Sequence, residues 1–299
     1  MQTLYAANRD KGLTSKAVAS AYNNHIQQSF DLYLFNLLQL REIAKYAIQD
    51  SAHRKSKHLP SIEDKKFTTK LYHNELIQST LDNAALNKLI KASPVRDYLT
   101  EDNTRRLYAD LLKTPEYKYY LEHTSTRHDH QQMLLFLYKY SVTGQIFNDL
   151  MEDYFVNWWD DKSLIIGAIK KTIKSLPLED TFLLTMQPNY ETITEFGKAL
   201  LLDVYTNDVK LLENIEPALN NWDADRVAII DMVILKMALS ELMNFPTIPT
   251  KVTLNEFVEI SKLYSTDKSK DFINGILDRL LKKLDKEGKI KKEGRGLVE

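Results

Sequence analysis

Apolar side chains recur at steps of three and four along most of this chain, the spacing that gathers them on one face of an α-helix. The longest stretch covers residues 17–51, where Ile26, Phe30, Leu34 and Leu37 follow it. The same spacing predicts helices over residues 66–91, 101–113, 115–122, 126–140, 142–157 and 160–175. Only 8 glycines and 8 prolines interrupt the 299 residues, which favours long helices over a turn-rich β fold. The pattern therefore predicts an all-α fold.

The last third of the chain has the same spacing over residues 191–205, 208–220 and 223–243. The third of these segments is apolar on nearly every side, so we expect it to be the most buried helix. It opens with Asp223, a residue suited to cap a helix N-terminus. Residues 253–278 then indicate two amphipathic helices joined by a polar elbow at residues 264–271.

Local signals place the boundaries between these last helices. Pro246 and Pro249 predict a loop over residues 245–250, because proline interrupts a helix. Thr253 and Glu256 have the spacing of a capping box, in which each side chain bonds the other residue's backbone amide. We therefore expect a helix to begin at Thr253.

Prolines and composition suggest three parts. Pro177 and Pro188 separate an N-terminal helical part with a large insertion, residues 1–190, from a C-terminal helical part, residues 191–285. The remaining residues, 286–299, are basic and contain three glycines, so we expect them to be disordered.

Charge and composition exclude several classes of protein. The formal net charge is −1, so any contact with RNA requires a local basic patch rather than a basic chain. Cysteine is absent, which excludes disulfides, a thiol nucleophile and a cysteine zinc site, and fits a cytoplasmic protein. No apolar run reaches the roughly 18–20 residues of a membrane span, and the first residues lack the apolar core of a signal peptide.

Two clusters of titratable residues invite a catalytic or metal-binding interpretation. His123, His128 and His130, with Asp129, have a His-x-His spacing that can bind a metal, but solvated histidines on a loop fit better. Glu152, Asp153, Asp160 and Asp161 flank Trp158 and Trp159, where they fit helix-end charges around a core tryptophan. The chain has no glycine-rich phosphate loop, nucleophile elbow or dinucleotide motif. We therefore predict no enzymatic activity and no cofactor.

Several motifs in the C-terminal part occur in the order found in the NusB family of transcription antitermination factors, and the resemblance extends over residues 196–284. FGKALLLDVYTNDVKLLENIEPAL is similar to the family's Phe-led helix pair, and DRVAIIDMVILKMALSEL to its central helix. Other matched positions are Asn255, Glu256, Glu259 and Lys262 in one helix and Phe272, Asn274, Gly275 and Asp278 in the closing helix. MQTLYA at the start is similar to the family's first helix just after its arginine-rich start.

The resemblance implies an all-α, NusB-like helical bundle with an extended helical N-terminal subdomain. It also implies a factor that binds boxA-type leader RNA of ribosomal RNA operons. The partners expected from the family are the small-subunit ribosomal protein NusE and the transcription elongation complex, with no membrane and no cofactor. A homodimer stays an open alternative, because some relatives dimerise and others do not.

The resemblance also assigns site residues. The residues expected to bind RNA are Gln2, Lys262, Tyr264, Lys268, Ser269, Lys270, Phe272 and Asn274. On the residues alone, a solvated turn with Phe272 in the core is the better interpretation of the elbow. The residues expected near NusE are Tyr5, Asp225 and Asp231. Asp231 has a second interpretation, an internal salt bridge with Lys236 or Arg226, because a charge within an apolar helix needs a partner.

Two departures from the family pattern bear on function. The arginine-rich start does not precede Met1, so we expect weaker RNA binding, a longer native protein or a truncated form. Residues 8–195 far exceed the compact family members, and with the segment 158–162 and the loop 245–249 they resemble NusB homologues of the Bacteroidetes group. We interpret the middle as a helical elaboration of the N-terminal subdomain.

Two other functions compete with antitermination. A helical protein-interaction scaffold that has weakened or lost RNA binding would fit the near-neutral charge. The NusB fold also occurs at the N-terminus of a ribosomal RNA cytosine methyltransferase family. That enzyme needs catalytic cysteines and a glycine-rich cofactor domain, and this sequence has neither.

Overall fold

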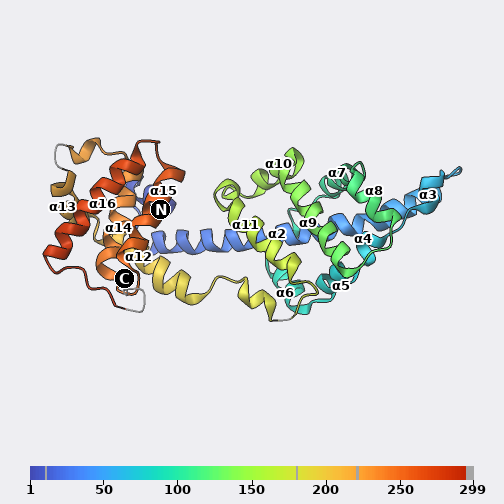
Figure 1. The fold of residues 1–299 in the computed structure, drawn as a ribbon, viewed down its shortest axis with the longest axis horizontal. Helices are drawn as coiled ribbons and strands as arrows, with labels where there is room; N and C mark the ends of the chain where they lie inside the picture. Colours follow the sequence, from blue (N-terminus) through green and yellow to red (C-terminus); the bar gives the residue numbers. More distant parts are fainter. Residues whose placement is uncertain (11, 180, 220–221, 294–299) are drawn as a thin grey trace. The chain divides into compact units, whose positions relative to one another are not determined.

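The computed structural model describes residues 1–10, 12–179, 181–219 and 222–293, and every regular element in these ranges is helical. The predicted all-α fold is confirmed. The chain divides into two compact units, drawn in Figure 1. We call Met1–His25 with Asn189–Glu299 the terminal unit, and Ile26–Pro188 the central unit. The sequence assigned residues 1–25 to the N-terminal part, whereas in the structure they pack with the C-terminal residues.

The central unit is built around the long helix α2 (Ser15–Ser56), whose residues up to His25 belong to the terminal unit. Nine α-helices and two short 3-10 turns, at Pro94–Arg96 and Phe182–Thr185, follow α2 in the described part of this unit. The α-helices are α3 (Ile62–Lys66), α4 (Lys70–His73), α5 (Glu75–Asp82), α6 (Ala84–Ala92), α7 (Glu101–Leu111), α8 (Pro115–Glu122), α9 (Arg127–Thr143), α10 (Gln145–Tyr154) and α11 (Trp158–Lys174).

Two asparagines divide the single helix predicted over residues 66–91 into α4, α5 and α6. The Asn74 side chain accepts hydrogen bonds from the Leu76 and Ile77 amides, and the Asn83 side chain accepts one from the Leu86 amide. Both are N-caps, which start a new helix and end the preceding one. The prediction was wrong here because the apolar spacing continues through both caps.

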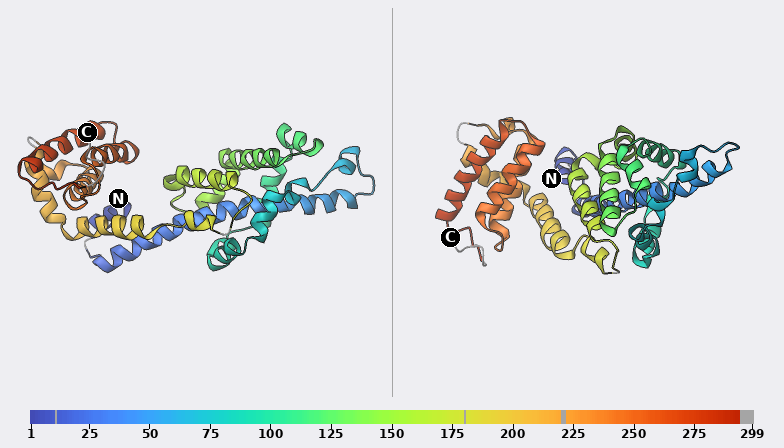
Figure 2. Two further views of the ribbon diagram at one scale, coloured as in Figure 1. Left: turned by 60° about the horizontal axis from the view of Figure 1, so that its bottom comes forward. Right: turned by 45° about the vertical axis from the view of Figure 1, so that its right-hand side comes forward.

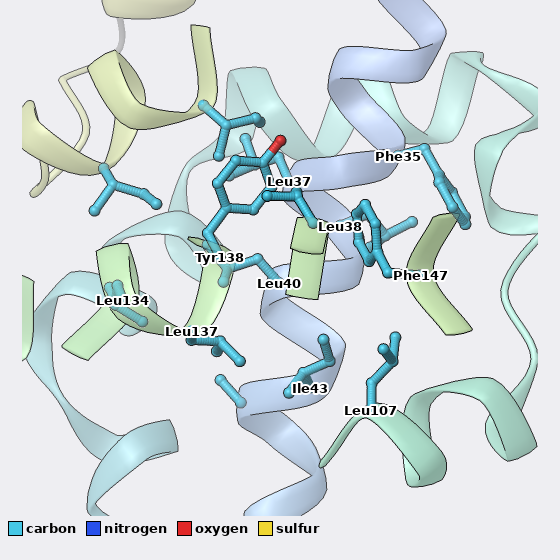
Figure 3. Close-up of a cluster of buried hydrophobic side chains, with 14 of the residues drawn as sticks. Phe35, Leu37, Leu38, Leu40, Ile43, Leu107, Leu134, Leu137, Tyr138 and Phe147 are labelled. Atoms are coloured by element: carbon cyan, nitrogen blue, oxygen red, sulfur yellow. The ribbon is translucent and has the colours of Figure 1, made fainter. Parts of the chain in front are cut away.

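Figure 3 shows the core of the central unit, where apolar side chains of α2 meet those of α7, α9 and α10. Phe35, Leu37 and Leu134 are fully buried, and Tyr138 donates a hydrogen bond of 2.9 Å to Asn36 within this core. Trp158 is also fully buried, whereas Trp159 beside it is 60% exposed. Apolar residues recur at helical spacing along the whole unit because its helices each turn one face toward this core.

Besides the start of α2, the terminal unit contains α1 (Gln2–Arg9) and the C-terminal helices, which Figures 1 and 2 show grouped together. These are α12 (Ala199–Thr206), α13 (Asp208–Leu219), α14 (Ile229–Asn244), α15 (Thr250–Tyr264) and α16 (Ser269–Lys286). Helix α14 packs against α1, α12, α13, α15 and α16. Ile234, Leu235 and Leu239 on α14 are fully buried, which confirms the prediction that the helix apolar on every side is the central one.

A π-helical turn, Glu191–Lys198, precedes α12 where the sequence predicted an uninterrupted α-helix. The Tyr22 hydroxyl donates a hydrogen bond of 3.0 Å to the Ile193 carbonyl in this turn. A Cβ atom at Gly197 would overlap the Tyr22 hydroxyl, so this contact requires glycine.

Both helix starts predicted from caps in the C-terminal part were wrong. Asp223 caps the short 3-10 turn Ala224–Arg226, and α14 begins later, at Ile229. Helix α15 begins at Thr250, directly after Pro249. Thr253 therefore lies inside the helix, fully buried, with its hydroxyl directed to the Pro249 carbonyl at 3.5 Å. The predicted capping box is absent because the Thr253 side chain fills the core.

Hydrogen bonds hold the residues that follow α16, where the sequence predicted a disordered tail over residues 286–299. Gly288 has the left-handed φ of +65° that commonly ends a helix, and the Lys289 amide bonds the Leu284 carbonyl at 2.9 Å. The Glu293 amide bonds the Pro246 carbonyl, and Lys292 bonds the Phe245 carbonyl. Residues 294–299 of the predicted tail, and Asn220 of the predicted helix 208–220, lie outside the described residues.

Candidate nucleic-acid interface

A buried carboxylate connects the start of α14 to the elbow between α15 and α16. Asp231 in the first turn of α14 is 5% exposed and accepts hydrogen bonds from Ser265 at 2.5 Å and Ser269 at 2.8 Å. The two serine hydroxyls also bond each other at 2.9 Å, and Thr266 lies 2.9 Å from Ser269. These contacts fix the short elbow relative to the central helix.

The predicted salt bridge of Asp231 with Lys236 is wrong. Lys236 instead pairs with Asp208 of α13 at 2.5 Å. Asp231 lies within the first turn of α14, and Ser269 is the first residue of α16, so the carboxylate is close to two helix N-termini. A helix N-terminus stabilises a negative charge, which together with the serines explains how Asp231 is accommodated in an apolar helix.

Seven of the eight residues predicted to bind RNA lie on the last turn of α15, the elbow or the first turns of α16. Lys268, Lys270 and Asn274 are exposed, whereas Tyr264 and Phe272 are half-buried. The part of the chain that the structure describes provides no ion pair for Lys268 or Lys270. Gln2, the eighth residue, is exposed on α1.

Two of the predicted RNA-binding residues are engaged inside the domain. Ser269 is buried, and its hydroxyl donates to Asp231, so it positions the elbow instead of meeting a base directly. Lys262 forms an ion pair with Glu259 on the same helix. An RNA phosphate would have to compete with that carboxylate for the lysine.

An aromatic pair beside the elbow includes a residue that the sequence analysis missed. Trp222 is 60% exposed, and its ring centroid lies 5.4 Å from that of Phe272, with the rings tilted by 58°. Phe272 also packs against the core of the terminal unit. A sequence signal could have found Trp222. It is a tryptophan in the polar stretch before the central helix, outside any apolar helix face, so the sequence does not assign it to the core.

The three residues predicted to contact a protein partner differ in exposure. Tyr5 on α1 is 39% exposed, and Asp225 in the 3-10 turn before α14 is exposed. Asp231 is buried and holds the elbow. Only Tyr5 and Asp225 therefore present their side chains at the surface.

Three of the histidines and carboxylates that the sequence singled out make contacts within the central unit. His130 lies 2.7 Å from the Tyr120 hydroxyl, and burial, with Lys70 nearby, lowers the pKa of His130. His123 stacks on Tyr119. Asp161 accepts hydrogen bonds from Ser29 and Asn157. Within residues 1–10, 12–179, 181–219 and 222–293, no three histidine or carboxylate side chains are grouped to hold a metal.

None of the helices in the described ranges combines the length and apolar character that a bilayer crossing requires.

Comparisons with known proteins show what part of this chain is similar to. Residues 165–282 match the model of the NusB family. The chain is 44% identical over 104 residues to the transcription antitermination protein NusB of Salinibacter ruber, covering 35% of this chain and 65% of that protein. It is 45% identical over 80 residues to the protein of the same name from Chloroherpeton thalassium, covering 27% of this chain and 38% of the relative.

A third relative, the transcription antitermination protein NusB of Natranaerobius thermophilus, is 46% identical over 81 residues, 27% of this chain and 58% of that protein. No solved structure matches the chain. The matched region is all-helical in its described residues, contains the elbow with Lys268 and Lys270, and is similar to the NusB family over residues 165–282. The chain spans less than two thirds of the length of each of these relatives.

Proposed function

We propose that this chain is a transcription antitermination factor, not an enzyme, and that its elbow binds boxA-type leader RNA of ribosomal RNA operons together with the ribosomal protein NusE. The observation that carries the proposal is the elbow itself, which lies inside the region that matches the NusB family. Next to the half-buried Phe272 it presents Lys268 and Lys270, for which the described residues provide no ion pair.

These residues have the chemistry that single-stranded RNA requires. Lysine ammonium groups attract phosphates, and aromatic rings stack on unpaired bases. The hydrogen bonds from Ser265 and Ser269 to Asp231 hold the elbow before RNA arrives. A preorganised surface loses less conformational entropy on binding, which favours affinity.

A second surface would bind NusE. Tyr5 and Asp225 are exposed on the same unit as the elbow, and in this proposal they contact the ribosomal protein. Two weak RNA-binding surfaces joined by a protein contact act as one stronger site, because the second contact becomes intramolecular. RNA affinity should therefore rise when the ribosomal protein is present.

The test is fluorescence anisotropy of a labelled boxA-type RNA with the full chain, with and without NusE, at two salt concentrations. The proposal predicts salt-sensitive binding that NusE strengthens. The double variant Lys268→Ala, Lys270→Ala should weaken binding and reduce the salt slope by about two, one for each phosphate contact. Lys283→Ala, Lys286→Ala is the matched control, because it removes two lysines from the last turn of the same helix, away from the elbow.

A helical scaffold with little RNA binding is the second candidate, and one observation favours it. Ser269 and Lys262 are both engaged within the domain, so the elbow offers fewer free groups than the sequence predicted. In that case the double lysine variant would bind RNA as weakly as the original chain. NusE would still bind, and Asp225→Ala would weaken that contact.

A further inference from the structure

We propose that Trp222 and Phe272, flanked by Lys268 and Arg279, form a platform on which one unpaired nucleobase stacks. The proposal rests on the proposed function, because it assigns a base-binding position within the same RNA surface. It adds two residues, Trp222 and Arg279, to those that the sequence assigned. The class of ligand is a single-stranded RNA segment with at least one base free of pairing.

The first argument is the exposure of Trp222. An indole left in solvent offers a large apolar face for stacking. Exposure alone does not mark a site, because Trp159 is exposed to the same extent, but Trp222 also contacts a second aromatic ring. Trp222 leaves 60% of its surface in solvent, although Phe272 lies against it at 5.4 Å. Phe272 packs on the core behind, so it holds the indole from one side and leaves the rest of the ring accessible.

The second argument is the arrangement of side chains on α16. Lys268, Phe272, Gly275 and Arg279 are spaced by four, three and four residues, so they follow one face of the helix. Lys268 is exposed and, in the described part of the chain, has no ion pair. A cation therefore lies about one turn from the aromatic pair, near enough for a phosphate next to a stacked base.

Arg279 supplies a second cation on this face. Its guanidinium donates to the Ala218 carbonyl at the end of α13 at 2.9 Å and to the Gly275 carbonyl at 3.2 Å. A guanidinium has five N–H donors, so three are left for a ligand. The two carbonyl contacts hold the exposed arginine in place, and a positioned guanidinium binds phosphate with good geometry.

Because Gly275 has no side chain, the helix backbone is accessible between the aromatic pair and Arg279. A Cβ atom built on it would meet nothing closer than the Arg279 guanidinium at 4.0 Å, so the position has open space above it. A ribose or a base edge can approach the helix backbone there. Among the nearby carboxylates, Asp223 accepts from the Asp225 amide and Asp278 pairs with Lys282, whereas Asp267 and Asp271 beside Lys268 and Phe272 are exposed.

The test uses the full chain, a fluorescein-labelled single-stranded RNA of mixed sequence, and the same strand annealed into a duplex. Trp222→Ala should weaken single-strand binding by roughly five- to a hundredfold, the effect of losing one stacked base. It should change duplex binding little, because paired bases cannot stack on the platform. Trp222→Phe should retain part of the affinity, because it keeps an aromatic face.

Trp159→Ala is the matched control, because Trp159 is equally exposed at 60% but belongs to the central unit. It should leave RNA affinity unchanged. Tryptophan fluorescence gives an independent readout, since RNA should quench the original chain but not Trp222→Phe. Circular dichroism of each variant separates loss of binding from loss of folding.

Two outcomes overturn the proposal in different ways. If the double lysine variant weakens RNA binding but Trp222→Ala does not, or if quenching persists in Trp222→Phe, the platform is refuted and RNA binding at the elbow stands. If the original chain binds no RNA with or without NusE, the platform and the proposed function both fail.

Discussion

The Ser269 hydroxyl, at the start of α16, donates a hydrogen bond of 2.8 Å to the carboxylate of Asp231, 38 residues earlier in the chain. Asp231 lies in the first turn of the central helix α14, and Ser269 follows the elbow directly. The contact therefore couples the geometry of a surface turn to the most buried helix of the unit. A substitution at either end should affect both stability and RNA binding.

Asp231→Ala should destabilise the helices around the elbow by about 1–3 kcal/mol, because two serine hydroxyls lose their acceptor in a buried place. Asp231→Asn should cost less, since one acceptor oxygen is kept. Native-state hydrogen exchange, read in peptides of α14 and α16, measures the opening free energy locally. Unchanged protection of these peptides in Asp231→Ala would show that the carboxylate does not hold the elbow.

RNA affinity offers a second readout of the same substitution. If Asp231 positions the elbow, Ser269→Ala should weaken RNA binding in the same direction as Asp231→Ala. If Asp231 contacts a protein partner directly, only the aspartate variants should reduce NusE binding. The two patterns separate a positioning residue from an interface residue.

The helices of this chain could largely be predicted from the sequence, and their contacts could not. Apolar spacing located α8 at both ends, and the uninterrupted apolar surface of α14 indicated its central place. Helix starts were predicted less well, because Thr253 has the right spacing for a cap but turns into the core. Spacing along the chain does not show which side of a helix faces its neighbours.

The candidate site shows the same limit. The family resemblance located the elbow, but no sequence pattern indicated that Ser269 would be buried beneath it. Its bond to Asp231, and the contact between Trp222 and Phe272, join residues far apart in sequence. Such contacts depend on how α13, α14 and α16 pack together. For the same reason Lys236, one of two possible partners suggested for Asp231, pairs with Asp208 instead.

The pair formed by Lys236 and Asp208 should respond asymmetrically to substitution. The Lys236 side chain is 5% exposed, whereas that of Asp208 is 41% exposed. Asp208→Asn leaves a buried ammonium without its charge partner and should cost about 1–3 kcal/mol, below the full loss for a wholly buried pair. Lys236→Met should cost less, because Asp208 can be hydrated and methionine fills the same space.

Thermal unfolding of the two single variants and the double variant measures this asymmetry. The double variant should be close to Lys236→Met, because the unpaired ammonium is then gone. A larger loss for Lys236→Met than for Asp208→Asn would contradict the interpretation that the buried lysine depends on the aspartate.

Glu241 should make the terminal unit less stable as the pH rises. Burial raises the pKa of Glu241 on α14 above its usual 4.5, against a smaller opposing effect of the Thr253 hydroxyl. The folded chain therefore holds a proton that the unfolded chain has released, so stability falls as the pH rises from 4.5 through the folded pKa. Hydrogen exchange of α14 between pH 4 and 8 should show this trend.

Glu241→Gln is the matched variant, because glutamine keeps the size and an acceptor oxygen but does not ionise. It should stabilise α14 at pH 7 and give no gain below about pH 4, where the original carboxyl is protonated. An equal gain at both pH values would assign the effect to packing instead of ionisation.

Asp64 in the central unit should show the opposite dependence on pH. Its carboxylate accepts hydrogen bonds from Lys57 at 3.0 Å and from the Ser61 amide at 3.0 Å, and Arg54 lies 3.1 Å away. The bond from Lys57 and then the bond from Ser61 lower the pKa of Asp64 to about 2. Because the folded pKa lies below the unfolded value of 3.8, its stabilising effect is complete above pH 3.8 and is lost as the pH falls toward 2.

The start of α3 should therefore open in acid before the rest of the central unit. Asp64 and Ser61 form a capping box there, and protonation removes the charge that Lys57 and Arg54 bind. Limited proteolysis with pepsin between pH 4 and 2 should cut residues 56–66 increasingly at lower pH. Asp64→Asn should be cut at a rate that is already high at pH 4 and changes little with pH. A steep pH dependence that persists in Asp64→Asn would show that another group controls this opening.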